Sequence, residues 1–303
     1  MIKKLGAGTF GEVWLIPWED GYAVLKVLKH PTPDNRERFA REARMLLRHR
    51  ENPHVLCLLH QEVDGVEPYF IVEHCDGGSL DKVLEAHGVW SATQVAYLIA
   101  HVAAGLDVIH GERGYHRDLK PANILLKWTN RELGAWTVKV GDFGLAREPD
   151  SRSATMTASP HGTPAYMPPE VQRGGHWTPA GDIYSLGITG IEMLTGSRER
   201  AGLRSATCPV WLRDLLLQMT VAELRARPSI QQVGVTVRVN LAPKQQVEHR
   251  PSPKPKEQTS SGWGWLLGGM AAATALALAT MNTRDANGRF HGDDGQFRSG
   301  RWG

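Results

Sequence analysis

The sequence is poor in cysteine and nearly balanced in charge. Its 303 residues include only three cysteines, Cys57, Cys75 and Cys208, which lie too far apart to show the spacing of metal ligands. They are typical of reduced thiols in an intracellular protein. The formal net charge of +3 is small for this length, which argues against nucleic acid as a partner.

We also expect no cleavable N-terminal signal. Met1–Lys4 leads directly into a glycine-rich segment with a strand pattern, without the apolar run of a signal peptide. We therefore expect the N-terminal part of the chain to remain in the cytoplasm.

Composition divides the chain into four segments. Residues 1–235 mix strand and helix patterns and are expected to form a globular domain. Residues 236–261 are rich in Pro, Lys, Gln and Ser; such a segment cannot bury a core, so we interpret it as a linker. Residues 262–281 carry no charge and are long enough for a membrane-spanning helix. Residues 282–303 have the composition of a disordered tail.

Strand patterns come first within the globular segment. Short apolar runs predict strands over Val13–Ile16, Tyr22–Leu28 and Tyr69–Val72. A helix over Asn35–His49 interrupts them, since its apolar residues recur at helical spacing.

Helical patterns dominate after Gly78. Ser91 and Gln94 form a capping box. It opens a helix whose apolar residues share one face, namely Val95, Leu98, Ile99, Val102, Leu106 and Ile109. Strands followed by helices indicate an α+β chain with a sheet-rich lobe and a helical lobe, and a functional site between them.

The segment Gly6-Ala-Gly8-Thr-Phe-Gly11 is a G-x-G-x-x-G motif, which occurs in several kinds of phosphate site. In a dinucleotide-binding fold a helix would follow, whereas here Glu12–Ile16 continues as a strand. The motif therefore predicts a hairpin whose glycines let backbone N–H groups approach phosphates closely.

Lys26 lies on the second predicted strand and Glu42 on the first predicted helix. Glu42 follows Phe39 by three residues and precedes Leu46 by four, so it lies on the apolar, inward face. A buried carboxylate is costly unless it is paired. We therefore expect an ion pair that fixes the Lys26 ammonium for binding phosphate oxygens.

A polar loop precedes the predicted strand Ile124–Leu126 and holds Asp118, Lys120 and Asn123. Asp118 can accept a hydroxyl proton, and Lys120 can neutralise a phosphoryl group during transfer. Asn123 can ligate a hard cation through oxygen, and Asp142, just past another strand, is a second ligand of this kind.

Together these motifs resemble those of the eukaryotic-type Ser/Thr protein kinases. The resemblance covers about residues 1–235, with the motifs in the family's order. They are Gly6/Gly8/Gly11, Lys26, Glu42, His116-Arg117-Asp118, Asn123, Asp142-Phe143-Gly144 and Pro169-Glu170. The implied fold is bilobal, with a small antiparallel sheet and one helix in an N-lobe (1–74) and a mainly helical C-lobe (75–235).

The resemblance implies an enzyme that transfers phosphate from ATP, with Mg²⁺ or Mn²⁺, to Ser and Thr hydroxyls of protein substrates. Asp118 would be the catalytic base, and Lys120 would bind the γ-phosphate. Asn123 and Asp142 would hold the metal ion.

The resemblance also implies a nucleotide site. Lys26, paired with Glu42, would contact the α- and β-phosphates beneath the glycine-rich loop. Val72 would be the gatekeeper of the hinge, the segment that joins the lobes. The groups expected around adenine are the backbones of Glu73 and Cys75 and the side chains of Val13, Val24 and Leu125.

Three further implied roles lie in the C-lobe. Thr163 would bond to Asp118 and Lys120, a pattern of Ser/Thr rather than Tyr specificity. Asp182 would brace the catalytic loop. Glu170 and Arg227 would form a buried ion pair.

The chain departs from the family pattern in several places. Val24 stands where alanine is usual, Pro168 replaces the alanine of the Ala-Pro-Glu motif, and the first strand begins almost at Met1. Only Ser197–Thr207 separates the helix that ends near Leu194 from the next one, where the family has a further docking helix. We therefore expect a shortened C-lobe.

Other functions remain open on the sequence. A pseudokinase, a scaffold or a membrane-tethered binding module would share the fold without needing Lys26, Asp118 and Asp142 together. A small-molecule phosphotransferase would share the aspartates without needing Thr163 or Arg227.

The uncharged segment 262–281 is expected to tether the kinase to a membrane. Trp263 and Trp265 at its start are typical of interfacial anchors. Basic residues flank both sides, so the orientation follows from the need of the kinase for cytosolic ATP. Kinase, linker and single span in this order resemble bacterial membrane-anchored Ser/Thr kinases; the alternative is a helix that packs on protein.

The segment between Asp142 and Glu170 holds candidate phosphosites, Ser159, Thr157 and Thr155. A phosphate there would add charge that Arg117 could bind, which would order the segment. We predict autophosphorylation that raises activity, with a second copy of the chain as candidate partner for the reaction in trans.

Overall fold

The computed structural model describes residues 2–7, 11–132, 134–144, 146 and 163–242. They belong to one compact unit, Met1–Gln245. Several predictions lie outside the described residues: Gly8, the candidate phosphosites Ser159, Thr157 and Thr155, the linker beyond residue 242, the span 262–281 and the tail.

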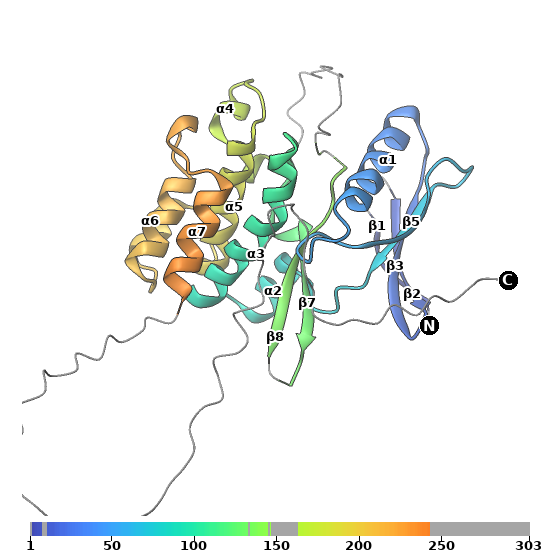
Figure 1. Cartoon of the computed structure of the whole chain (residues 1–303), viewed down its shortest axis with the longest axis horizontal. Coiled ribbons are helices and arrows are strands. Elements are labelled where there is room, and N and C mark those ends of the chain that lie inside the picture. The colour runs from blue at the N-terminus through green and yellow to red at the C-terminus, as the bar shows by residue number, and fades with distance from the viewer. Residues whose placement is uncertain (1, 8–10, 133, 145, 147–162, 243–303) are drawn as a thin grey trace, which may run out of the picture. The chain divides into compact units, whose positions relative to one another are not determined.

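The N-lobe is an antiparallel sheet of five strands, in the order β1-β2-β3-β5-β4, with one helix beside it (Figure 1). The helix, α1, spans Pro33–Arg48 and is capped by Thr32, whose hydroxyl accepts the N–H of Asn35. The strands are β1 Lys3–Ala7, β2 Gly11–Trp18, β3 Gly21–Leu28, β4 Leu58–Glu62 and β5 Tyr69–Glu73.

The apolar patterns predict β2, β3, β5 and α1 to within a few residues, but they do not show β1 or β4. The glycine-rich hairpin predicts the first strand, β1, instead. β1 is exposed along its whole length, and β4 along most of it. A strand that buries so little apolar surface shows no alternation from which it could be predicted.

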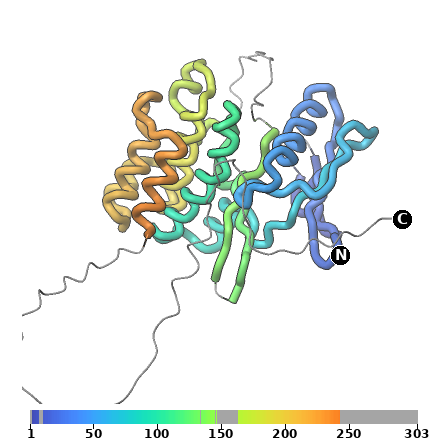
Figure 2. Tube along the Cα trace, in the orientation of Figure 1, coloured from blue at the N-terminus to red at the C-terminus, as the bar shows by residue number. Residues whose placement is uncertain are grey.

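The C-lobe is mainly helical (Figures 1 and 2). Its helices are α2 Leu80–His87, α3 Ala92–Gly111, α4 Pro169–Gln172, α5 Pro179–Thr195, α6 Val210–Met219 and α7 Ile230–Leu241. The short 3-10 helices of the described part of the chain are η1 Pro121–Asn123, η2 Pro164–Tyr166, η3 Arg200–Arg204 and η4 Leu224–Ala226. A three-stranded sheet contains β6 Gly78–Ser79, β7 Ile124–Asn130 and β8 Ala135–Val140, in that order.

Helix α3 is central to the C-lobe and packs against α5, α7 and β8. The capping box of Ser91 and Gln94 is present at its start, and its predicted apolar face is buried. Among the described residues, α3 is the one helix long and apolar enough to cross a membrane, but half of that stretch is buried within the fold. Such burial fits the core helix of a globular domain.

The connection between α5 and α6 agrees with the predictions, whereas the C-terminal end of α7 does not. Between α5 and α6 the chain forms only η3, in agreement with a shortened C-lobe. At the C-terminal end, α7 continues to Leu241, so residues 236–241, which composition places in the linker, are helical. The reason is Val237, which is fully buried and extends the packed face of the helix.

Candidate active site

Asp118 lies at the centre of a hydrogen-bonded cluster in the loop between α3 and η1. Its Oδ1 accepts the backbone N–H of Thr163 at 2.9 Å and the Thr163 hydroxyl at 3.0 Å. The Lys120 ammonium bridges Asp118 Oδ2 and Thr163 Oγ1, both at 2.7 Å. The structure therefore joins the three residues that the sequence predicts as one catalytic group.

Asn123 ties this cluster to the other predicted metal ligand. Its side-chain N–H group donates to the backbone oxygen of Asp118 at 2.8 Å and to its Oδ2 at 3.1 Å. The backbone oxygen of Asn123 accepts the N–H of Gly141, which directly precedes Asp142. Since Asn123 donates through nitrogen, its amide oxygen is the atom suited to a cation.

The side-chain oxygens of Asn123 and Asp142 suit a hard divalent cation such as Mg²⁺. Among the described residues, no group of three or more His, Cys, Asp or Glu side chains gathers to hold a metal ion. Two hard oxygen ligands suit Mg²⁺, which keeps several waters and is held by one or two carboxylates plus substrate phosphates. Asp142 has a positive φ of 60°, a left-handed conformation that costs energy for a non-glycine residue and is found at functional sites.

Buried Asp182 of α5 binds the backbone of the loop that contains Asp118. It accepts the backbone N–H groups of His116 at 2.8 Å and Arg117 at 3.0 Å, and its Oδ2 lies 2.9 Å from His110 Nε2. Burial opposes its charge, but the bonds and charges of His110 and His116 lower the pKa of the Asp182 carboxyl. The Asp182 carboxylate binds the backbone N–H of Arg117, which helps to hold that residue in a left-handed conformation with a φ of 71°.

On the N-lobe side, Lys26 of β3 and Glu42 of α1 form the predicted ion pair. The Lys26 ammonium lies 2.8 Å from Glu42 Oε1 and 2.6 Å from Oε2. Burial, together with the charge of nearby Asp142, raises the pKa of the Glu42 carboxyl to about 7, although Lys26 acts in the opposite sense. The opposing charges of Glu42 and Asp142 outweigh burial at Lys26 and raise the pKa of its ammonium.

Val13 and Val24, two of the apolar residues predicted around adenine, share the sheet face of Lys26. Val13 pairs with Lys26 across β2 and β3, and Val24 pairs with Val72 across β3 and β5. Cross-strand partners project to the same face, as do residues two apart on one strand. Leu125 lies on β7, paired with Lys139 of β8.

The comparisons with known proteins agree with this geometry. The family described as "Protein kinase domain" matches residues 1–206. The chain belongs to the protein kinase family.

Several serine/threonine-protein kinases resemble this kinase. PkaA of Streptomyces coelicolor is 35% identical over 210 residues, which cover 64% of this chain and 38% of that protein. Sid1 of Schizosaccharomyces pombe is 34% identical over 204 residues, 66% of this chain and 42% of that protein. PknA of Mycobacterium tuberculosis is 33% identical over 209 residues, 66% of this chain and 47% of that protein. The chain thus spans less than half the length of these relatives.

The glycine-rich loop of the kinase is described in part. A side chain at Gly11 would bring its Cβ to 2.1 Å from the backbone oxygen of Val27, so glycine is required there for the close approach of β3. A side chain at Gly6 would meet nothing within 4 Å. Packing of the hairpin therefore explains Gly11, independently of any phosphate.

The hinge follows β5. The backbone N–H of Glu73 donates to the backbone oxygen of Cys57 at 3.0 Å, and Cys75 accepts the N–H of Gly78 at 3.1 Å. Burial raises the pKa of the Cys75 thiol to about 12, so the thiol stays protonated and unreactive. The predicted adenine contacts of Glu73 and Cys75 therefore depend on backbone atoms.

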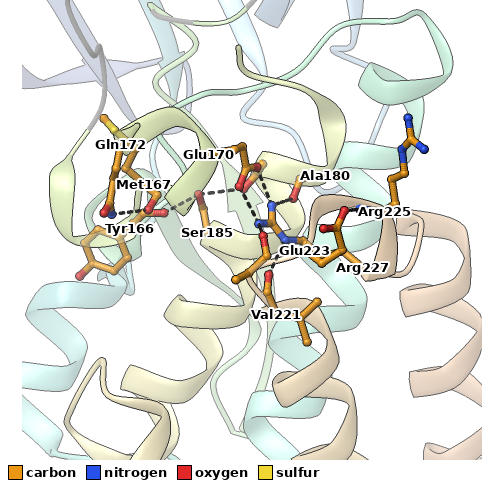
Figure 3. A network of polar contacts seen from close by, with 12 residues as sticks. Tyr166, Met167, Glu170, Gln172, Ala180, Ser185, Val221, Glu223, Arg225 and Arg227 are labelled. Carbon is orange, nitrogen blue, oxygen red and sulfur yellow. Dashed lines mark hydrogen bonds and ion pairs between the residues drawn. The ribbon is translucent and has the colours of Figure 1, made fainter. Parts of the chain in front are cut away.

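Figure 3 shows the predicted ion pair of Glu170 and Arg227. The guanidinium makes two bonds of 2.7 Å with the carboxylate and also donates to the backbone oxygens of Ala180, Val221 and Ala222. The Arg227 side chain is fully buried and lies over the Tyr184 ring. It joins α4 to the chain before α7.

Some polar contacts near the site were not predicted from the sequence. His110 binds Asp182, and a signal for it exists, because His110 follows Leu106 by four residues and so extends the apolar face of α3. Lys127 and Lys139 bind the Glu73 carboxylate. They lie on separate strands, and no spacing in the sequence brings them together.

Proposed function

We propose that this chain is an ATP-dependent protein kinase that phosphorylates Ser and Thr hydroxyls of protein substrates. The observation that carries the proposal is the cluster of Asp118, Lys120 and Thr163, with bonds of 2.7–3.0 Å. It holds a carboxylate and an ammonium side by side, as transfer of a phosphoryl group to a hydroxyl requires.

In the proposed reaction, the nucleotide supplies the γ-phosphoryl group. Asp118 orients the substrate hydroxyl and accepts its proton as the oxygen bonds to phosphorus and the bond to the ADP oxygen breaks. Lys120 stabilises the negative charge on the phosphoryl oxygens. Lys26 holds the α- and β-phosphates, and Asn123 and Asp142 would hold Mg²⁺ or Mn²⁺.

The Lys120–Thr163 bond of 2.7 Å supports Ser/Thr specificity. It places Lys120 beside Asp118, where the short hydroxyl side chains of Ser and Thr would enter.

A phosphorylation assay tests the proposal and separates it from the alternatives. The full chain is incubated with labelled ATP, Mg²⁺ and either a generic basic protein or small hydroxyl compounds, with Asp118→Asn as the negative control. We expect label on Ser and Thr of the protein, and none with Asp118→Asn. Nucleotide binding without transfer would indicate a pseudokinase, and transfer only to small compounds would indicate a small-molecule phosphotransferase.

Two finer proposals concern attachment to a membrane and regulation by phosphorylation. The uncharged segment 262–281 supports a cytoplasmic kinase tethered to a membrane. A chain truncated after Gln258 is expected in the soluble fraction and active, and the full chain with membranes; full-length protein in the soluble fraction would contradict the tether.

The second finer proposal, regulation of the kinase by phosphorylation, is supported by the surroundings of Arg117. Its Nε is buried and has no hydrogen-bond partner among the described residues, so we propose that it binds a phosphate on Ser159, Thr157 or Thr155, added in trans by a second copy. Peptide mass spectrometry before and after phosphatase treatment tests this, and full activity without phosphate there would contradict it.

A further inference from the structure

The carboxylate of Glu73, at the start of the hinge, is held by two lysines that take no part in the proposed reaction. Lys127 Nζ lies 2.6 Å from Glu73 Oε2, and Lys139 Nζ lies 2.6 Å from Oε1. Oε1 also accepts the backbone N–H of Cys57 at 2.8 Å. We refer to Glu73, Lys127 and Lys139 as the hinge cluster.

Glu73 and Lys139 of the hinge cluster are largely shielded from water, and Lys127 is partly exposed. The side chains of Glu73 and Lys139 are each 10% exposed, and that of Lys127 is 38% exposed. Burial opposes the charge of Glu73, but the hydrogen bonds of the two lysines lower the pKa of its carboxyl. Charges this buried are costly unless paired, so the three groups depend on one another.

The two lysines come from strands that connect directly to the proposed metal ligands. Lys127 lies on β7, which begins at the residue after Asn123. Lys139 lies on β8, which ends two residues before Asp142. Each strand therefore links a ligand at one end to the hinge carboxylate through a lysine.

The hinge cluster also lies beside the proposed adenine site. Leu125 and Lys139 are cross-strand partners, so their side chains share a face of the sheet. Lys127 is two residues after Leu125 and projects to that face as well. The lysines thus reach the hinge from the face that carries Leu125.

We propose that Lys139 and Lys127 are positioning residues that set the distance between the adenine-binding backbone of the hinge and the metal ligands Asn123 and Asp142. This inference rests on the proposed function, because it assumes that one nucleotide contacts both ends. A triphosphate held at both ends gains affinity only if the two ends have the right separation. Adenosine lacks phosphates and contacts only the hinge end, so its affinity does not depend on that separation.

The test compares the binding of MgATP and of adenosine by calorimetry, with the full chain and its Lys139→Met variant. We expect the dissociation constant of MgATP to rise about tenfold, within the usual range of coupling between sites, and that of adenosine to stay nearly constant. Lys127→Met, at the more exposed position, should change the ratio in the same direction by less. Lys139→Arg keeps the charge and should restore the ratio, and Lys82→Met on the exposed surface of α2 is the matched control.

Equal weakening of MgATP and adenosine, or no change in either, would overturn the inference, since the cluster would then serve only local structure. If Lys139→Met does not fold, the Lys127→Met ratio decides. Failure of the unmodified chain to transfer phosphate would instead contradict the proposed function, because the binding ratio does not depend on transfer.

Discussion

The two lobes hold their functional groups in different ways. In the N-lobe, Lys26 is positioned by a single carboxylate, that of Glu42, on a helix that packs beside the sheet. In the C-lobe, Asp182 alone accepts two backbone N–H groups of the loop that contains Asp118 and binds His110, and it is completely buried. The C-lobe site is thus fixed by several bonds, whereas the N-lobe site depends on one ion pair.

This difference suggests that the C-lobe provides a rigid site and that the N-lobe can switch it. A group held by several buried bonds is preorganised and costs no rearrangement during reaction. A group held by one pair between a sheet and a helix can be lost by a small shift of α1, which makes the N-lobe the natural place for control. Substitutions in the two lobes should therefore differ in what they change.

The largest effect is expected at Asp118. Asp118→Asn keeps the shape but removes the proton acceptor, so kcat should fall at least about 10²-fold, the scale of general-base catalysis. The assay is phosphate transfer to a protein substrate, with exposed Asp64→Asn as the matched control. Near-normal turnover of Asp118→Asn would contradict its role as the base.

A C-lobe scaffold residue should change stability instead. Arg227→Met leaves Glu170 without its partner, and removal of one member of a buried ion pair costs about 3 kcal/mol. Urea denaturation measures this, with Arg225→Met as the control, because Arg225 is exposed and points away from the pair (Figure 3). If both variants unfold at the same urea concentration, Arg227 is not the support described here.

The N-lobe pair should change activity as well as stability. Lys26→Met removes a charged hydrogen bond to phosphate, so we expect kcat/KM for ATP to fall about 10- to 100-fold. It also leaves the buried Glu42 carboxylate without its partner, so the variant should lose stability too. Kinetics and urea denaturation of the same samples check both, and an unchanged kcat/KM for ATP would contradict the contact of Lys26 with phosphate.

The smallest effect concerns pH. Because the pKa of Glu42 is raised to about 7, acidification from pH 8 to 6 should protonate it, break the pair with Lys26 and lower activity severalfold. The pKa of Glu42 is higher in the folded than in the unfolded state, so its protonation stabilises the fold. Acidification from pH 8 to 6 should therefore not lower stability through Glu42. Glu42→Gln should lack this acidic decline; if it retains the decline, another group is responsible.

The sequence predicts that the polar C-lobe residues meet, because they are close along the chain. Asp118, Lys120 and Asn123 share one loop, so their order alone indicates that they meet. Glu42 is predicted to face inward by helical spacing, and the structure confirms its pair with Lys26. In contrast, β1 and β4 carry no apolar alternation, and the end of α7 depends on the packing of Val237.

The sequence by itself determined the family, the grouping of Asp118, Lys120 and Asn123 in one loop, and the pairing of Lys26 with Glu42, since each depends on local order or on the cost of burying one charge. Only the tertiary structure decided that Lys127 and Lys139 meet at Glu73 and that His110 supports Asp182. These contacts join segments far apart along the chain. Their partners are chosen by strand register and helix packing, which no local pattern of residues contains.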